Sequence, residues 1–205
     1  MSQSHPSRKT IALYAGTVAL VIFGIASWSL SFRLAWVQTQ HTQQTGLWRP
    51  PSLPARPVKL HLRVEGQGIA AEALGRELAR RLAELGGLEV VLLEGDPGPD
   101  QHPFVVASIR ETSGFWTPFH SQKSAVVELK YASGTSRIGP AWSVSPEDPI
   151  RESQSLWLQA RSDVELGATG IVSRPFVYEA LVEAPVAGFV KRLAQALVPE
   201  SGPAK

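Results

Sequence analysis

A glycine-rich turn is the segment of this chain whose residue types come nearest to known cofactor chemistry. Gly66 and Gly68 belong to the sequence GQGIAA, which follows a predicted strand and opens a predicted helix. In dinucleotide-binding folds such glycines let the backbone approach a pyrophosphate, and an acidic residue after the next strand, here Glu94, holds the ribose. The preceding strand, however, carries a charged residue or His at every second position, whereas the first strand of that fold is apolar throughout. We therefore expect the glycines to form a tight turn, and we predict no bound cofactor.

Patterns for nucleophilic and metal chemistry are also incomplete. Ser121 and Lys123 stand two residues apart, whereas the acyl-enzyme motif S-x-x-K needs a spacing of three. His102 and His120 could join Asp96 or Asp100 on a metal, but no pair of them has i,i+4 spacing on a helix or forms a compact ligand run. The chain contains no Cys, which excludes disulfides, thiolate metal sites and a lipidated cysteine. We predict no catalytic residue, no metal site and no enzymatic activity.

Aromatic residues are the predicted partner-binding group. They gather in the sequence GFWTPFH between two predicted strands and recur in the long connection that follows: Phe115, Trp116, Phe119, His120 and Trp142. Exposed rings in a connection are typical of a surface that contacts a partner or a membrane. Alternatively, the rings fold back over the open end of the sheet. The sequence leaves both interpretations open.

The longest apolar run covers residues 11–32 and contains no charged residue. As a helix it would measure about 33 Å, which is enough to cross a hydrocarbon core. Aromatic residues that favour a bilayer interface stand near its ends: Tyr14, Trp28, Phe32 and Trp36. We predict a single transmembrane helix that acts as a signal anchor in the lipid bilayer of the cell membrane, in preference to a cleaved signal peptide. The basic residues before the run place the N-terminus in the cytoplasm and the C-terminal domain outside, in the periplasm if the membrane is a bacterial inner membrane.

The remaining organisation follows from composition. We expect residues 1–10 to be a cytoplasmic N-terminus, residues 33–57 a Gln/Thr- and Pro-rich linker, residues 58–198 an extracytoplasmic domain and residues 199–205 a disordered tail. The net charge is only +2, and we therefore predict no nucleic-acid partner.

Periodicity predicts an α+β domain. Residues 58–65 alternate between apolar and polar side chains, as in a half-buried strand, whereas residues 69–85 carry one apolar stripe, as in a helix. Further strands are predicted at residues 88–94, 104–110, 124–132, 156–166 and 171–182. A turn at residues 167–170 separates the last two strands, and Pro185 opens a closing helix over residues 186–197. This order predicts a mostly antiparallel sheet with two helices packed on one face.

The strand, helix, strands, helix order, closing with ELGATGIVSRPFVYEALVEAPVAGFVKRLAQAL, resembles small bacterial envelope accessory proteins. Similar families are the lipopolysaccharide-assembly lipoproteins and the auxiliary lipoproteins of ABC transporters. The resemblance covers about residues 58–197 and rests on this pattern, without a diagnostic motif. Those families carry a lipidated Cys, and this chain has none.

The resemblance implies an accessory protein or subunit of a membrane-protein complex. We predict that the domain is non-catalytic and binds its partner through a sheet edge or through the aromatic connection. The alternatives are a lipid- or small-molecule-binding module and, less favoured, a nucleotide-dependent enzyme that uses the GQGIAA turn. The sequence does not set the oligomeric state.

Overall fold

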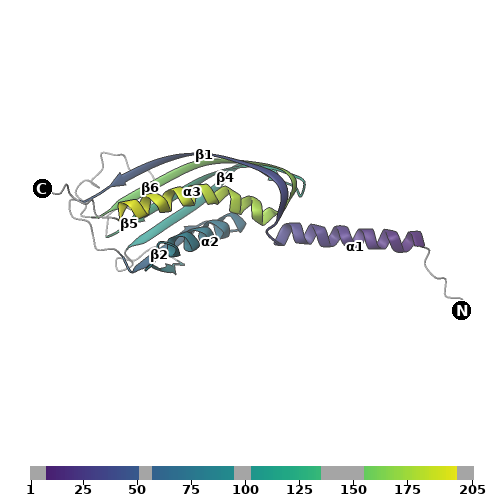
Figure 1. Cartoon of the computed structure of the whole chain (residues 1–205), viewed down its shortest axis with the longest axis horizontal. Coiled ribbons are helices and arrows are strands. Elements are labelled where there is room, and N and C mark those ends of the chain that lie inside the picture. Colours follow the sequence, from purple (N-terminus) through teal and green to yellow (C-terminus); the bar gives the residue numbers. More distant parts are fainter. Residues whose placement is uncertain (1–7, 51–56, 95–102, 135–154, 198–205) are drawn as a thin grey trace.

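One mixed sheet with three helices makes up the part of the chain that the structure describes. This computed structural model describes residues 8–50, 57–94, 103–134 and 155–197. In chain order the elements are α1 (Arg8–Ser29), β1 (Arg33–Trp48), β2 (Lys59–Glu65), α2 (Ile69–Ala83), β3 (Glu89–Leu92), β4 (Phe104–Trp116), β5 (His120–Ala132), β6 (Trp157–Val172) and α3 (Arg174–Ala196). Across the sheet the strand order is β1-β6-β5-β4-β2-β3 (Figure 1).

The sheet combines an antiparallel and a parallel part. The neighbouring pairs β1–β6, β6–β5 and β5–β4 are antiparallel, whereas β2 runs parallel to both β4 and β3. The α+β class is therefore as predicted, but the sheet is mixed. The parallel pair β2 and β3 is joined through α2, because a parallel connection must cross from one end of the sheet to the other.

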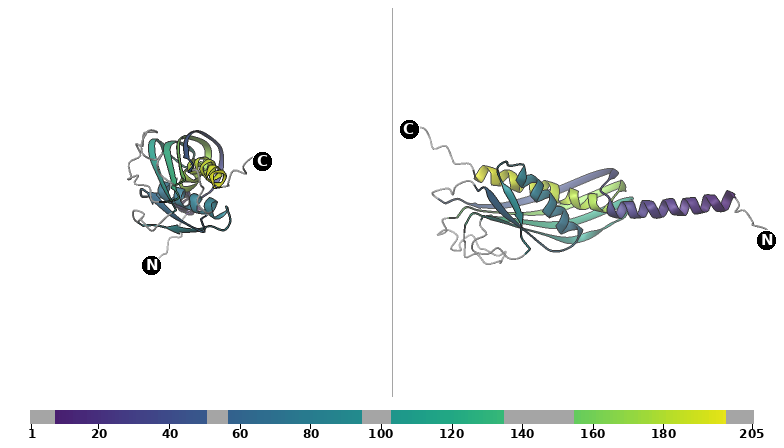
Figure 2. Two further views of the ribbon diagram at one scale, coloured as in Figure 1. Left: turned by 90° about the vertical axis from the view of Figure 1, so that its left-hand side faces the viewer. Right: turned by 90° about the horizontal axis from the view of Figure 1, so that it is seen from below.

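Helices α2 and α3 pack against each other on the same face of the sheet, as the sequence predicts. Seen along the molecule, the sheet curves around α3 (Figure 2). The core lies between this face and the two helices. It is built from the apolar stripe of α2, the buried face of α3 and alternate residues of the strands, among them Leu62, Leu74, Leu129, Leu158, Phe189 and Leu193. Burial of such side chains contributes about 1.5–3 kcal/mol each.

Helix α1 corrects the prediction for the apolar run. It ends at Ser29, three residues before the end of that run, and the amide of Phe32 donates a hydrogen bond to Ser173 Oγ at 2.8 Å. Among the described residues no helix is both long and apolar enough to cross a membrane. This finding contradicts the predicted transmembrane helix and, with it, the single-pass signal anchor, the cytoplasmic N-terminus and the extracytoplasmic location of the domain.

Strand β1 occupies most of the predicted linker. Residues 33–48 pair with β6 over the whole strand, from Arg33 opposite Val172 to Trp48 opposite Trp157. Polar Gln and Thr side chains suggested a linker, but Thr is β-branched and a half-exposed strand accepts Gln readily. The proline-rich part, residues 51–56, lies outside the described residues.

Strand β6 continues through the predicted turn at residues 167–170. Gly170 has φ 112°, and a Cβ there would lie 2.8 Å from the carbonyl oxygen of Leu34. Glycine at this position therefore permits the close approach of β1 and does not reverse the chain. The prediction of a turn was wrong, and so was that of a separate strand over residues 171–182.

Helix α3 begins twelve residues earlier than predicted, at Arg174. Pro175 lies in its first turn, and Pro185, which was predicted to open the helix, lies in its interior. A proline there lacks the amide that would bond to the previous turn. Burial of neighbouring residues on the same helix, including Leu181, Val182 and Phe189, outweighs that loss.

Candidate functional site

The free edge of β1 is the feature that the fold leaves available for binding. In the described part of the chain no strand pairs with the side of β1 that faces away from β6. A strand at a sheet edge presents a row of unpaired N–H and C=O groups, which is a template for another strand. The direction of these groups along β1 follows from the hydrogen bonds of its neighbour.

Two backbone hydrogen bonds set this direction. The amide of Gly170 donates to the carbonyl oxygen of Phe119 at 3.0 Å, and that of Val172 donates to Pro118 at 2.9 Å, so both β6 residues face β5. Their partners on β1 must therefore face the free edge. The register between β1 and β6 has no shift, and the free edge receives the backbone groups of every second residue: Ala35, Val37, Thr39, His41, Gln43, Thr45 and Leu47.

The side chains of β1 carry little that would keep another strand away. Natural edge strands are usually protected by charged residues, proline or a bulge. From Leu34 to Leu47 the strand contains no Asp, Glu, Lys, Arg or Pro. Large apolar side chains are exposed near its two ends, with 76% of Leu34, 80% of Trp36 and 51% of Leu47 accessible to solvent.

Helix α3 supports β1 from the inner face. The Gln43 side-chain amide donates to the carbonyl oxygen of Pro185 at 3.3 Å, and the Arg49 guanidinium donates to that of Gln195 at 2.8 Å. These contacts tie the middle of the strand and the residue that follows it to the helix. A strand held in an extended conformation before binding loses less conformational freedom when a partner adds to it.

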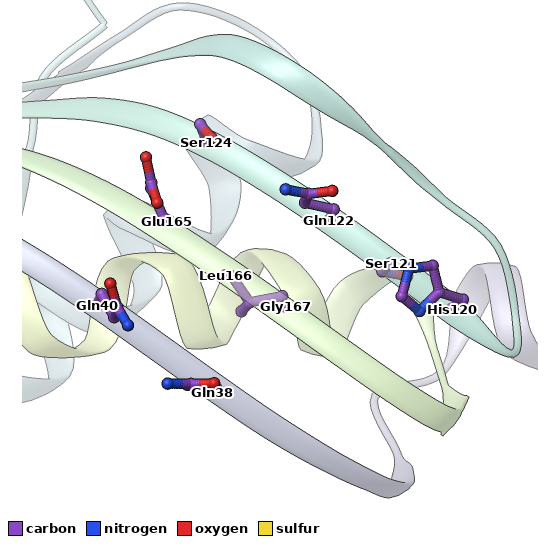
Figure 3. A pocket seen from close by; sticks show the side chains of 9 residues that line it. All are labelled: Gln38, Gln40, His120, Ser121, Gln122, Ser124, Glu165, Leu166 and Gly167. Carbon is purple, nitrogen blue, oxygen red and sulfur yellow. The ribbon is translucent and has the colours of Figure 1, made fainter.

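A shallow polar hollow lies on the opposite face of the sheet, which the helices leave uncovered (Figure 3). Its centre is Gly167 on β6, which is paired with Gln38 of β1 on one side and with Gln122 of β5 on the other. One step along the strands, Glu165 lies between Gln40 and Ser124. The hollow has a volume of about 180 Å³ and offers amide, hydroxyl and carboxylate groups to a ligand.

The aromatic residues of the β4–β5 hairpin contact the chain's own first helix. Trp116 and Trp28 meet edge to face with ring centroids 5.8 Å apart, and Phe119 stacks on Phe23 at 5.9 Å. Trp116 also donates from its indole N–H to the carbonyl oxygen of Val172 at 3.3 Å. Two of the predicted partner-binding rings therefore bind α1 within the same chain.

The other predicted aromatic positions are distributed differently. Phe115 is 47% exposed and lies 5.6 Å from the ring of His120, which in turn approaches Thr169. Phe119 keeps 62% of its surface exposed despite its contact with α1. Trp142 lies outside the described residues.

The end of α1 is held by the start of α3. The guanidinium of Arg174 lies over the Trp28 ring at 4.0 Å, and the Ser31 hydroxyl donates to the Glu179 carboxylate. Cation–π contacts of this kind contribute about 0.5–2 kcal/mol. From this attachment the helix extends away from the sheet (Figure 1), and its apolar side chains, including Leu13, Tyr14, Leu20 and Ile25, are exposed.

Of the four predicted interface residues, only Tyr14 and Trp28 lie on α1. Phe32 connects α1 to β1, and Trp36 lies on β1 itself. The ring of Trp28 is engaged by Trp116 and Arg174.

A charged cluster lies beneath the hairpin, where Lys123 pairs with Glu111. Partial burial by itself raises the pKa of the Glu111 carboxyl, but hydrogen bonds from Lys123 and Tyr178 outweigh it and bring this pKa below its ordinary value. For Lys123, burial lowers the pKa, and the hydrogen bonds with Glu111 and Tyr178 reverse the effect and raise it. The pair is therefore ionised at neutral pH and holds the hairpin against α3.

The glycine-rich turn GQGIAA connects β2 to α2. Gly66 and Gly68 have φ values of 106° and 88°, which favour glycine and account for its presence at both positions. Glu94 is exposed, two residues beyond the end of β3. Among the described residues no three side chains of the metal-ligating types come together.

Sequence reasoning missed β1 as the candidate site. The alternation of Val37 and Thr39 with Gln38 and Gln40 is visible, but all of these except Val37 are polar and the apolar contrast of a strand is lost. Gly167 was interpreted as part of a turn, whereas it leaves the centre of the hollow without a side chain.

Comparison with known proteins finds similarity to solved structures. No family model matches this chain, and no curated protein does. Two solved structures of a PelC dodecamer from Paraburkholderia phytofirmans, one of them a point variant, are similar to it with a TM-score of 0.39 each. Their identities are 12% and 11%, over 72% of this chain and 98% and 96% of theirs. This likeness is too distant to assign a family or a function, and the resemblance to envelope accessory lipoproteins stays a prediction.

Proposed function

We propose that this chain is a non-catalytic, protein-binding subunit whose edge strand β1 accepts a strand from a partner. The observation that carries the proposal is the row of seven outward-facing residues from Ala35 to Leu47, uninterrupted by charge, proline or bulge. Addition of a strand to such an edge gives affinity through backbone hydrogen bonds and specificity through alternate side chains.

Two further features support this role. Exposed apolar side chains at Leu34, Trp36 and Leu47 resemble the apolar anchors around which protein interfaces form. Helix α1 exposes apolar side chains over most of its described length, and large apolar surfaces of this kind gain free energy when a partner covers them.

The test uses proline to block the edge. Thr39 directs its N–H to the free edge, so Thr39→Pro removes one outward donor without removing a hydrogen bond to β6. Thr39→Val is the matched control, because it keeps the N–H and the β-branched shape. The full chain and both variants serve as bait in an extract of the source cells, and a recovered protein is then purified and its dissociation constant measured for each.

The proposal predicts binding by the unmodified chain and by Thr39→Val, with at least tenfold weaker binding by Thr39→Pro. Equal dissociation constants for all three would contradict it. Circular dichroism and chemical denaturation establish that the proline variant is folded.

The hollow at Gly167 favours a second candidate function, the binding of a small polar molecule. Its lining of Gln38, Gln122 and Glu165 offers hydrogen-bond donors and acceptors and no apolar pocket for a lipid tail. A Cβ at Gly167 would meet no atom within 4 Å, so Gly167→Phe fills the hollow without a clash at the backbone. Glucose and glutamine, as neutral probes, should perturb the NMR signals of the unmodified chain and not those of the variant. Identical titrations would exclude this use of the hollow.

A further inference from the structure

The chemical character of β1 is nearly symmetric about its midpoint. The central segment, residues 38–45, reads QTQHTQQT and is polar throughout, whereas residues 34–37 and 46–48 on either side are apolar or glycine. His41 is the midpoint of residues 34–48. An antiparallel copy of the same strand, centred on His41, would therefore place residues 38–44 opposite one another and residues 34–36 opposite residues 46–48. The one mismatch in this register is Val37 opposite Thr45.

We propose that the strand that docks on β1 is β1 of a second copy of this chain, antiparallel and related by a two-fold axis at His41. The inference rests on the proposed use of the β1 edge and names its occupant. The resulting dimer is isologous, as most symmetric dimers are, and its two sheets join into one continuous sheet across the axis.

The backbone geometry is compatible with this register. With the axis at His41, each outward-facing residue meets an outward-facing residue of the second copy, for example Ala35 opposite Leu47 and Thr39 opposite Gln43. Directly opposed outward residues are the hydrogen-bonded pairs of an antiparallel ladder, which exchange both N–H···O bonds. A strand of this length forms a ladder of about 50 Å.

The side chains also complement one another. Trp36, which is 80% exposed, comes to lie opposite Gly46 of the second copy, which has no side chain of its own. The ring of Trp157 lies beside Gly46 and offers the indole an apolar neighbour. Ala35 and Leu47 meet on the inner face. Between Leu34 and Trp48 the two copies bring no like charges together, whereas a charged foreign strand finds no opposite charge there. Just beyond this segment the same register places Arg33 opposite Arg49, whose guanidinium is turned to the carbonyl oxygen of Gln195.

The decisive experiment is a register-specific disulfide, because the chain has no Cys of its own. Gln40 lies opposite Thr42 of the second copy in a non-hydrogen-bonded pair, whose Cα atoms stand about 4.5 Å apart. We therefore expect a full chain carrying Gln40→Cys, mixed with one carrying Thr42→Cys, to form a covalent dimer under mild oxidation. Either variant alone places its cysteines on a diagonal of about 7–8 Å, which is too far for a disulfide. A mixture of Gln38→Cys with Thr42→Cys is the control for a shifted register.

Charged substitutions at His41, on the two-fold axis, give an independent measurement of dimerisation. His41→Glu and His41→Lys each place like charges opposite each other, and each should weaken dimerisation by roughly fivefold or more in sedimentation equilibrium. An equimolar mixture of the two places Glu opposite Lys and should restore the dimer. Pairing through α1 or another surface would be insensitive to both substitutions.

The outcomes separate this inference from the proposed function. If the unmodified chain is monomeric and no disulfide forms, while Thr39→Pro still abolishes binding of another protein, self-pairing is wrong and the β1 edge remains the docking site. If Thr39→Pro changes neither self-association nor binding of another protein, both proposals are wrong. Equal disulfide formation in the Gln38→Cys mixture would overturn the axis at His41.

Discussion

The two edges of the sheet in this protein are built in opposite ways. At one edge, β3 contributes only the four residues Glu89–Leu92, and it begins with a carboxylate. At the other, β1 contributes sixteen residues and presents no charged side chain between Leu34 and Leu47. A short, charged edge is a usual protection against unwanted strand pairing. The edge at β3 is therefore short and charged, whereas the edge at β1 is long and carries a charge only at its first residue, Arg33. This difference is why we assign binding to β1.

The largest expected effect on stability comes from proline substitutions at two adjacent positions of β1, each made in a separate variant. Gln40 faces β6 through its backbone and Thr39 faces the free edge, so only Gln40→Pro removes a hydrogen bond within the sheet. We expect Gln40→Pro to lower the free energy of unfolding by about 2–3 kcal/mol. Thr39→Pro should lower it by less than about 1 kcal/mol.

Urea denaturation followed by circular dichroism measures both values. Gln40→Val and Thr39→Val serve as controls that keep the amides. If Gln40→Pro and Thr39→Pro lower the free energy of unfolding equally, the backbone directions assigned to β1 are wrong. The proposal of a docking edge would then have no structural basis.

A smaller effect is expected away from the edge, at the ion pair beneath the β4–β5 hairpin. Glu111→Gln leaves the Lys123 ammonium, which is largely buried, without its charged partner. Because the Glu111 side chain is more than one third exposed, we expect a loss of only about 1 kcal/mol. Glu128→Gln, on the same sheet, is a control with a longer and more open ion pair to Arg161.

The pH dependence of this pair has a defined sign. The pKa of Glu111 is below the ordinary 4.5, so its contribution is complete above pH 4.5 and is lost as pH falls through the lowered value. The pKa of Lys123 is above the ordinary 10.5, so its contribution is complete below pH 10.5 and is lost as pH rises through the raised value. Glu111→Gln should reduce both losses, and an unchanged pH profile of stability would contradict the assignment.

The centre and the edges of the sheet also differ in what the sequence could predict. Apolar alternation in β2 and the apolar stripe of α2 were sufficient, because burial on one face imposes a period that the sequence retains. The same signal is absent from β1, where both faces are largely exposed and polar residues occupy both. Edge strands carry the weakest pattern because packing constrains them least.

Long-range contacts account for the other wrong predictions. Gly170 suggested a turn, but it is required by the approach of Leu34 and Ala35, which are more than 130 residues away in sequence. Pro185 suggested a helix start, but the packing of α3 against the sheet keeps it inside a longer helix. The aromatic hairpin was recognised, yet its contact with α1 depends on the tertiary arrangement and left no local signal.

A third contrast concerns a polar group at the centre of the sheet. The hydroxyl of Tyr131 is fully buried on β5 and has no hydrogen-bond partner among the described residues, and burial raises its pKa. Polar groups on the β1 edge are instead in contact with water. Since an unpaired buried hydroxyl costs free energy, we expect Tyr131→Phe to leave stability unchanged or to raise it by up to about 1 kcal/mol. If urea denaturation shows that Tyr131→Phe is less stable by more than about 1 kcal/mol, the hydroxyl makes a hydrogen bond in the folded protein.

The smallest effect should come from removing the charge that protects the other edge. Glu89→Thr leaves β3 without its carboxylate, but the strand still offers only four residues for pairing. We expect its sedimentation behaviour to match that of the unmodified chain, with stability changed by less than about 0.5 kcal/mol. If Glu89→Thr associates through β3, a single charge is sufficient protection. The absence of charge, and not the length of the strand, would then explain why β1 accepts a partner strand. In that case Thr42→Lys alone should abolish association through the β1 edge.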